Sequence, residues 1–116
     1  MHELPLLRAI VSISVERARR VGASRIVAVD LKVGELRGLD AGWMQRSFAL
    51  AAQGTPAEAA TLRITQRRAV VACATCGMEQ HGHGALELDT QCARCPSRDL
   101  RVSAGDELLI ESIDVI

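Results

Sequence analysis

The chain has 116 residues, and its 14 lysine and arginine residues balance its 14 aspartate and glutamate residues. A neutral chain has no overall attraction for nucleic acid or anionic membrane, which argues against both as partners. The length allows one modest hydrophobic core, or a small core beside a lobe that is stabilised by a bound metal ion. The first residues lack the basic start and cleavage site of a signal peptide, and no uncharged run approaches the ~20 residues that span a bilayer. We therefore expect a cytoplasmic protein.

Two helices and one strand are predicted in the first half of the chain. Apolar residues recur at helical spacing over residues 4–21, and Gly22 is a plausible stop. Residues 25–33 alternate between apolar and polar, as in a half-buried strand. A second helix is predicted over residues 41–53, with Asp40 as its N-cap. The residues expected to face inward are Val27, Val29, Leu31 and Val33 on the strand, and Trp43, Met44, Phe48 and Ala51 on the second helix.

The second half predicts further strands around a cysteine-rich insertion. Residues 60–66 alternate, and the chain ends in the apolar stretch LLIESIDVI, which needs sheet neighbours. Its expected neighbours are the two earlier strands. The predicted fold class is therefore α+β, in which a small sheet and two helices form one domain from residues 1–71 and 104–116. Residues 72–103 form an inserted zinc-ribbon lobe in this prediction.

All four cysteines of the chain lie in two CxxC pairs separated by fifteen residues: Cys73, Cys76, Cys92 and Cys95. Each tight turn can give two thiolates to one tetrahedral ion, and the loop is long enough to bring the pairs together. A shell of four thiolates has no open position, so zinc there is predicted to be structural rather than catalytic. A redox dithiol needs only one CxxC, and iron–sulfur clusters more often use other spacings.

Two histidines, His81 and His83, lie between the cysteine pairs in the sequence HGHG. They are candidates for an auxiliary metal site or a replacement ligand, or they belong to a solvated loop tip. Either one close to the zinc would make its surroundings sensitive to pH.

The chain begins Met1-His2-Glu3, which offers a second candidate metal site. A retained amino terminus, the His2 backbone amide and the His2 imidazole form a short chelate, and nitrogen donors in a plane suit Ni(II) or Cu(II). Glu3 adds an amide and a carboxylate, although a charge favoured by the helix dipole explains it equally well. Asp40 is a candidate second-shell carboxylate, with helix capping as the simpler role.

Taken together, the start MHE, the segment GTPAEAATLRI, the paired CxxC motifs and the ending ELLIESIDV closely resemble the HypA/HybF family of hydrogenase nickel-incorporation proteins. The resemblance covers the whole chain. It implies that Met1, His2 and Glu3 bind nickel and that the four cysteines bind zinc. Two positions depart from the family pattern: Leu50 stands where a second aromatic residue is common, and Pro96 stands where glycine is frequent. Neither change removes an expected ligand.

The resemblance implies a metallochaperone that helps insert Ni(II), its transferred cargo, into the large subunit of [NiFe]-hydrogenase, with Zn(II) as a structural ion. It also implies a nickel-handling GTPase and the hydrogenase precursor as partners, and no catalytic activity. The oligomeric state stays open, with a homodimer as one alternative. A zinc-ribbon module that binds nucleic acid or transcription proteins is the competing hypothesis, and it predicts a basic face and stacking aromatics. A third hypothesis is an enzyme that uses a Cys–His pair.

Overall fold

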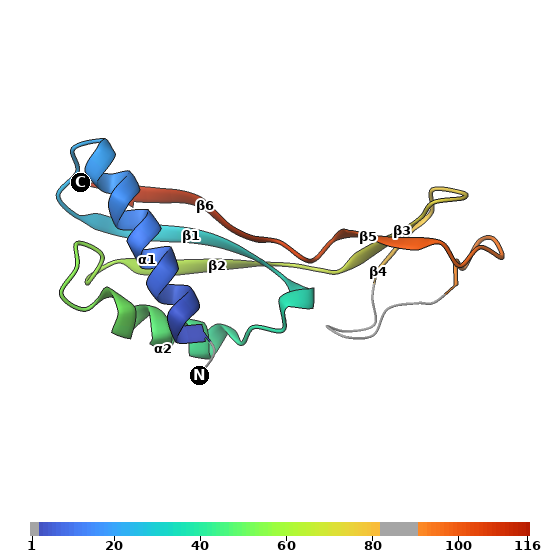
Figure 1. Cartoon of the computed structure of the whole chain (residues 1–116), viewed down its shortest axis with the longest axis horizontal. Coiled ribbons are helices and arrows are strands. Elements are labelled where there is room, and N and C mark those ends of the chain that lie inside the picture. The colour runs from blue at the N-terminus through green and yellow to red at the C-terminus, as the bar shows by residue number, and fades with distance from the viewer. Residues whose placement is uncertain (1–2, 82–90) are drawn as a thin grey trace. The chain divides into compact units, whose positions relative to one another are not determined.

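The structure is a computed structural model that describes residues 3–81 and 91–116. Its elements confirm the predicted α+β class (Figure 1). In chain order they are α1 (Glu3–Arg20), β1 (Ile26–Gly34), the short 3-10 helix η1 (Glu35–Arg37), α2 (Ala41–Ala52), β2 (Thr61–Arg67), β3 (Val70–Cys73), β4 (Glu79–His81), β5 (Leu100–Ala104) and β6 (Leu108–Val115). No helix among the described residues is long and apolar enough to cross a membrane.

The chain folds into two compact units, and the boundaries between them fall within β1 and β2 and after the first residue of β6. The first unit comprises Met1–Leu31, Leu39–Thr65 and Leu109–Ile116. The second unit comprises Lys32–Gly38 and Gln66–Leu108. Each unit contains a sheet of three strands, in the order β2-β1-β6 in the first and β4-β3-β5 in the second.

The first unit is built around β1, the central strand of its sheet. β1 and β6 are antiparallel, since Arg25 and Ile116 exchange backbone hydrogen bonds beside their ends. β1 and β2 run in the same direction and are joined through α2 (Figure 1). The terminal strand therefore pairs with β1, as expected, but β2 lies on the far side of β1. Among the residues that the structure describes, the largest fully buried side chains all belong to this unit: Leu7, Ser14, Ile26, Val29, Leu31 and Met44.

Helix α1 forms because its apolar residues repeat at helical spacing. Leu7, Val11 and Ala18 are buried along its inner side, and its last turn carries three arginines, where cations suit the helix dipole. Gly22 ends the helix with a φ of 75°. The Gly22 amide donates to the Arg19 carbonyl and the Ala23 amide to the Ala18 carbonyl, which is the Schellman arrangement.

Helix α2 begins where the sequence predicts, but its inner side differs from the prediction. The Asp40 carboxylate accepts a 2.9 Å hydrogen bond from the Trp43 amide, so Asp40 is the N-cap. The inner side is formed by Met44, Phe48 and Ala52, which recur every four residues. Trp43 lies about 100° around the helix from Met44, and its side chain is 48 % exposed. The prediction that Trp43 faces inward is therefore wrong.

Two smaller corrections concern Ala51 and Val27. Ala51 is only partly buried, because Ala52 takes the inward position of the last turn. Val27 is exposed, while its neighbours Ile26 and Ala28 are buried. The alternation that predicted β1 therefore holds from Val29 to Val33 but not at the start of the strand.

The second unit has β3 at its centre, antiparallel to both β4 and β5. Val71 and Cys73 are buried on one face of β3, whereas Val70 and Ala72 are half-buried on the other. At the end of β5 the chain turns at Gly105, whose φ is 101°. A side chain at Gly105 would collide with the backbone of Ala69, so the close approach of these two backbone segments requires glycine.

Candidate metal centre

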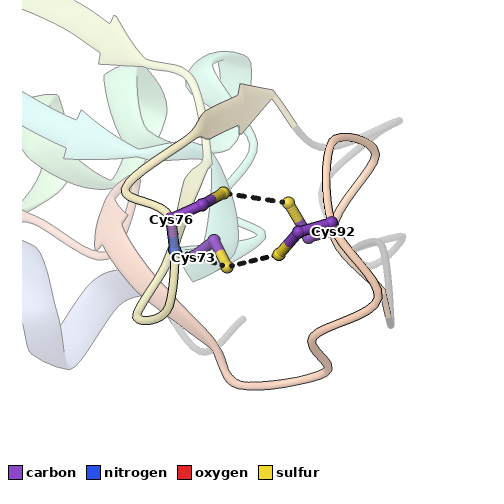
Figure 2. Close-up of side chains that lie close together, drawn as sticks. Cys73, Cys76 and Cys92 are labelled. Atoms are coloured by element: carbon purple, nitrogen blue, oxygen red, sulfur yellow. Dashed lines mark hydrogen bonds between the residues drawn. The ribbon is translucent and has the colours of Figure 1, made fainter.

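The four cysteines come together in the second unit, from the two ends of a long connection. Cys73 ends β3 and Cys76 lies in the turn after it, while Cys92 and Cys95 precede β5. All four Sγ atoms lie within 4.8 Å of one another (Figure 2). The Sγ atoms of Cys73 and Cys95 are 3.6 Å apart, as are those of Cys76 and Cys92. Thiolates at ~2.3 Å from a tetrahedral zinc ion are about 3.8 Å apart, so the spacing fits one such ion.

Each CxxC pair forms a tight turn that directs backbone amides at sulfur. In the first turn, the Cys73 amide donates to the Met78 carbonyl, and the Cys76 amide points at the Cys73 sulfur over 3.5 Å. In the second turn, the Cys92 amide donates to the Ser97 carbonyl, and the Arg94 amide points at the Cys92 sulfur over 3.4 Å. Amide donors stabilise thiolate charge, so both turns prepare their cysteines to bind a cation.

The pKa values of the thiols reflect this arrangement. The amide of Cys76 is the main cause that lowers the pKa of Cys73 to about 6, and the amide of Met78 is the main cause that lowers the pKa of Cys76. The Ser97 amide also favours the thiolate of Cys95, but burial and the other three cysteines together outweigh it and raise the pKa of Cys95 to about 12. Four thiols this close cannot all ionise without a cation, and a divalent ion removes that penalty.

Among the described residues, one arginine hydrogen-bonds directly to the backbone of a metal-ligand cysteine. Arg94 donates from its guanidinium to the Cys76 carbonyl over 3.0 Å. Other arginines near the cysteines in sequence are engaged elsewhere: Arg67 pairs with Glu107 at 3.5 Å, and Arg101 pairs with Asp99 at 3.3 Å.

Two polar contacts that the sequence did not reveal join the cysteine turns. The Thr75 hydroxyl donates to the Ser97 hydroxyl over 2.9 Å, which links the first turn to the second. The Gln80 side-chain carbonyl accepts from the Ala93 amide at 2.9 Å, which links β4 to the second turn. No motif marks these residues, because their roles depend on how the two turns face each other.

The histidine predictions have different outcomes. His81 is the last residue of β4, opposite Val70, and its side chain is exposed. It is in a strand rather than at a loop tip, and the metal-ligand cluster found among residues 3–81 and 91–116 contains cysteines alone. His83 lies outside the described residues, so its role stays a prediction.

The predicted nickel ligands lie at the other end of the sequence. Glu3 is the first residue of α1, where its charge suits the helix dipole. Met1 and His2 lie outside the described residues, and the nickel site stays a prediction. Asp40, the candidate second-shell residue, is engaged in capping α2.

Comparison with known proteins decides the family. The family model described as hydrogenase/urease nickel incorporation, metallochaperone, hypA matches residues 1–115. The chain belongs to the HypA family. This is a family of metallochaperones that act in hydrogenase maturation, and the match gives no support to the nucleic-acid alternative.

Relatives and solved structures agree with membership of the HypA family. The chain is 34 % identical to hydrogenase maturation factor HypA of Pelodictyon phaeoclathratiforme, over 99 % of this chain and 96 % of the relative. It is 36 % identical to hydrogenase maturation factor HybF of Salmonella typhimurium, over 99 % of both chains. Its fold matches the solution structure of the Ni metallochaperone HypA from Helicobacter pylori with a TM-score of 0.69 and 20 % identity, over 98 % of this chain and 97 % of that one.

Proposed function

We propose that this HypA family protein binds Ni(II) at its amino terminus and delivers it to the large-subunit precursor of [NiFe]-hydrogenase. The observation that carries the proposal is the family match, which begins at residue 1 and so includes Met1-His2-Glu3. The ligands are the Met1 amine, the His2 imidazole, local backbone amides and Glu3. Nitrogen donors arranged in a plane satisfy the geometry that Ni(II) favours.

A terminal site of this kind suits a metal that must be passed on. The amine and amide nitrogens bind nickel only after they lose protons, so affinity rises with pH. Ligands at a chain end can be replaced one at a time by those of an acceptor. Nickel is therefore the cargo, and the chain performs no catalysis on it.

The cysteines have a separate, structural role in this proposal. Residues 72–103 form a zinc-binding domain in which the four thiolates hold one zinc ion, and residues 1–71 and 104–116 form the nickel-binding domain. The closeness of the sulfurs and the amides directed at them support zinc. A closed four-thiolate shell offers no position for a substrate, which supports a structural ion rather than a catalytic one.

The partners follow from hydrogenase maturation, the process that the family serves. We infer a nickel-handling GTPase as the donor and the hydrogenase precursor as the acceptor, with a homodimer as the alternative to a monomer. Nucleic acid and membranes are not partners in this proposal, consistent with a balance of 14 basic and 14 acidic residues. Four cysteines spaced as metal ligands rather than paired in disulfides fit a cytoplasmic location, where cysteines stay reduced.

The decisive experiment is a nickel titration of protein that begins at Met1, compared with His2→Ala. We expect His2→Ala to abolish nickel binding and to leave zinc content and helical circular dichroism unchanged. His81→Ala is the matched control, because it removes an exposed histidine of the second unit and should leave nickel affinity intact. Nickel affinity equal to that of the unaltered protein in His2→Ala would disprove the proposal. A residue added before Met1 should weaken binding by altering the terminal amine.

A further inference from the structure

The four sulfurs of the cysteine cluster form two close pairs, and each pair joins the two cysteine turns. Cys73 lies 3.6 Å from Cys95, and Cys76 lies 3.6 Å from Cys92, measured between their Sγ atoms (Figure 2). In each pair, one sulfur comes from the first turn and the other from the second. Keeping the cluster closed therefore requires contacts that hold one turn against the other.

The pair Cys73 and Cys95 is accompanied by a contact between two hydroxyl groups. The Thr75 hydroxyl donates to the Ser97 hydroxyl over 2.9 Å. The same two residues serve this pair through their backbone. The amide of Cys76, and after it the amide of Thr75, lower the pKa of Cys73, while the Ser97 amide favours the thiolate of Cys95. The hydroxyl contact therefore ties together two residues whose amides stabilise this pair of sulfurs.

Ser97 meets Thr75 from a well-defined position. The Ser97 carbonyl accepts from the Cys92 amide at 2.9 Å, and the Ser97 hydroxyl accepts from the Asp99 amide at 3.1 Å. The residue before it, Pro96, restricts rotation of the backbone just after the last cysteine. The hydroxyl of Ser97 is thus positioned by the second turn itself.

The pair Cys76 and Cys92 is accompanied by Arg94 instead. The Arg94 guanidinium donates to the Cys76 carbonyl over 3.0 Å, and the Arg94 amide points at the Cys92 sulfur over 3.4 Å. One residue of the second turn thus contacts both members of this pair. Thr75 and Arg94 are both exposed, so neither side chain is needed for an apolar core.

We propose that the Thr75–Ser97 hydroxyl pair and Arg94 are positioning residues that hold the two cysteine turns together and slow the release of the metal ion. Residues that orient the ligands of a metal typically change its affinity by about 10–100-fold when they are replaced. This inference rests on the proposed function, which assigns zinc to the cysteines and nickel to the amino terminus. Slow release keeps cargo nickel from replacing the structural ion.

The test measures the rate at which full-length, zinc-loaded protein loses zinc to an excess of the chromogenic chelator pyridylazoresorcinol. Thr75→Val keeps the shape of the side chain without its hydroxyl, and we expect it to speed release by about tenfold. Thr75→Ser keeps the hydroxyl and should restore slow release. Arg94→Met should also speed release. Arg98→Gln, which removes the charge of another exposed arginine beside the cysteines, is the matched control and should not.

Two further measurements distinguish positioning of the sulfurs from general stabilisation of the second unit. The ligand-field absorption bands of Co(II)-loaded protein report the geometry of the sulfur shell, so Thr75→Val should shift them and Thr75→Ser should not. The double variant Thr75→Val with Ser97→Ala should release zinc about as fast as Ser97→Ala alone, because both changes remove the same contact. Amide resonances of β3 and β5 in the zinc-loaded variants should be retained.

Several results would overturn the inference while the proposed function stands. Equal release rates in Thr75→Val and the unaltered protein exclude the hydroxyl pair. Equally fast release in Arg98→Gln and Arg94→Met assigns the effect to nearby charge rather than to the contact of Arg94. Loss of the β3 and β5 resonances in zinc-loaded Thr75→Val shows that the hydroxyl maintains the whole unit. Unaltered protein that holds less than one zinc ion per chain overturns the zinc assignment as well, and nickel binding at His2 is measured separately.

Discussion

The two units of this protein differ in what holds each of them together. The first unit buries large apolar side chains from α1, β1 and α2, among them Leu7, Ile26 and Met44. The buried residues of the second unit are smaller: Val33, Ala69, Val71, Cys73, Cys92 and Ala104. No leucine, isoleucine, methionine or phenylalanine is buried among the described residues of the second unit. The described part of the second unit buries little apolar volume, so we expect a bound metal to supply folding free energy there.

In the proposed function, this contrast lets one short chain serve two metals. A structural ion has to stay bound, and the four cysteines on two amide-rich turns are the ligands proposed for it in the second unit. Cargo nickel has to leave, and the proposed ligands are at a chain end joined to a helix whose stability comes from apolar packing. Separate sources of stability would allow the proposed nickel exchange to proceed without unfolding the first unit.

Removal of the thiolate-bound metal should have the largest effect. Cys73→Ser or a strong chelator should unfold the second unit, because structural zinc contributes about 10–16 kcal/mol of apparent binding free energy in small zinc domains. The helices both lie in the first unit, so circular dichroism at 222 nm should change little. Amide resonances of β3 and β5 measure the loss. Retention of those resonances without metal would show that the second unit folds by burial alone.

A truncation in the core of the first unit should destabilise that unit and leave the second unit intact. Leu7→Ala leaves a cavity at a fully buried position of α1 and should cost about 2–5 kcal/mol of unfolding free energy, measured by urea denaturation of the helices. Zinc content should not change. Leu50→Ala is the matched control, since Leu50 is 57 % exposed and its loss should cost no more than about 0.5 kcal/mol. Equal costs for the two variants would contradict the assigned core.

Local sequence signals were sufficient for much of this arrangement. Apolar periodicity predicted both helices, the side chain of Asp40 predicted the start of α2, and the spacing of the cysteines predicted a single cluster. Each of these features depends on residues close together in the chain, or on one ligand that requires four sulfurs. The spacing of a metal motif carries long-range information that periodicity lacks.

The features that sequence could not supply all depend on distant partners. Trp43 is apolar and was expected to be buried, but the rotation of α2 is set by Met44 and Phe48 against the rest of the core. The contact of Gly105 with Ala69 joins segments that no pattern relates. An apolar residue predicts burial only when the orientation of its helix is known, and that orientation comes from packing.

A third prediction concerns the close approach of Gly105 to the backbone of Ala69 within the second unit. Gly105→Ala requires a positive φ and forces a methyl group into the backbone of Ala69, so it should cost about 1–3 kcal/mol or more of unfolding free energy. Gly38→Ala is the matched control: its φ is also positive, at 63°, but a methyl group there meets no atom within 4 Å. The difference between the two variants, measured by thermal denaturation of zinc-loaded protein, isolates the collision. Equal melting temperatures would show that Ala69 moves aside.

The smallest expected effect concerns the polar side of the first sheet, where Arg63 of β2 joins the other two strands. Its guanidinium binds Asp30 of β1 with contacts of 2.6 and 3.0 Å, and Asp114 of β6 at 2.7 Å. The Ser112 hydroxyl also donates to Asp30 over 2.7 Å. Chiefly because of Arg63, the pKa of Asp30 falls from an ordinary 3.8 to about 2.

A lowered carboxyl pKa sets the direction of the pH effect. The folded protein holds this proton less tightly than the unfolded chain, so the stabilisation is fully present above about pH 4 and is lost as pH falls towards 2. Arg63→Gln should therefore flatten the dependence of helix unfolding on pH over that range, and Ser112→Ala should do so less. All three proteins, the two variants and the unaltered protein, are measured without metal, because acid would also displace an ion bound to the thiolates. An unchanged slope in Arg63→Gln would mean that solvent screens the pair, as it does for many exposed ion pairs, and that the first unit relies on apolar burial alone.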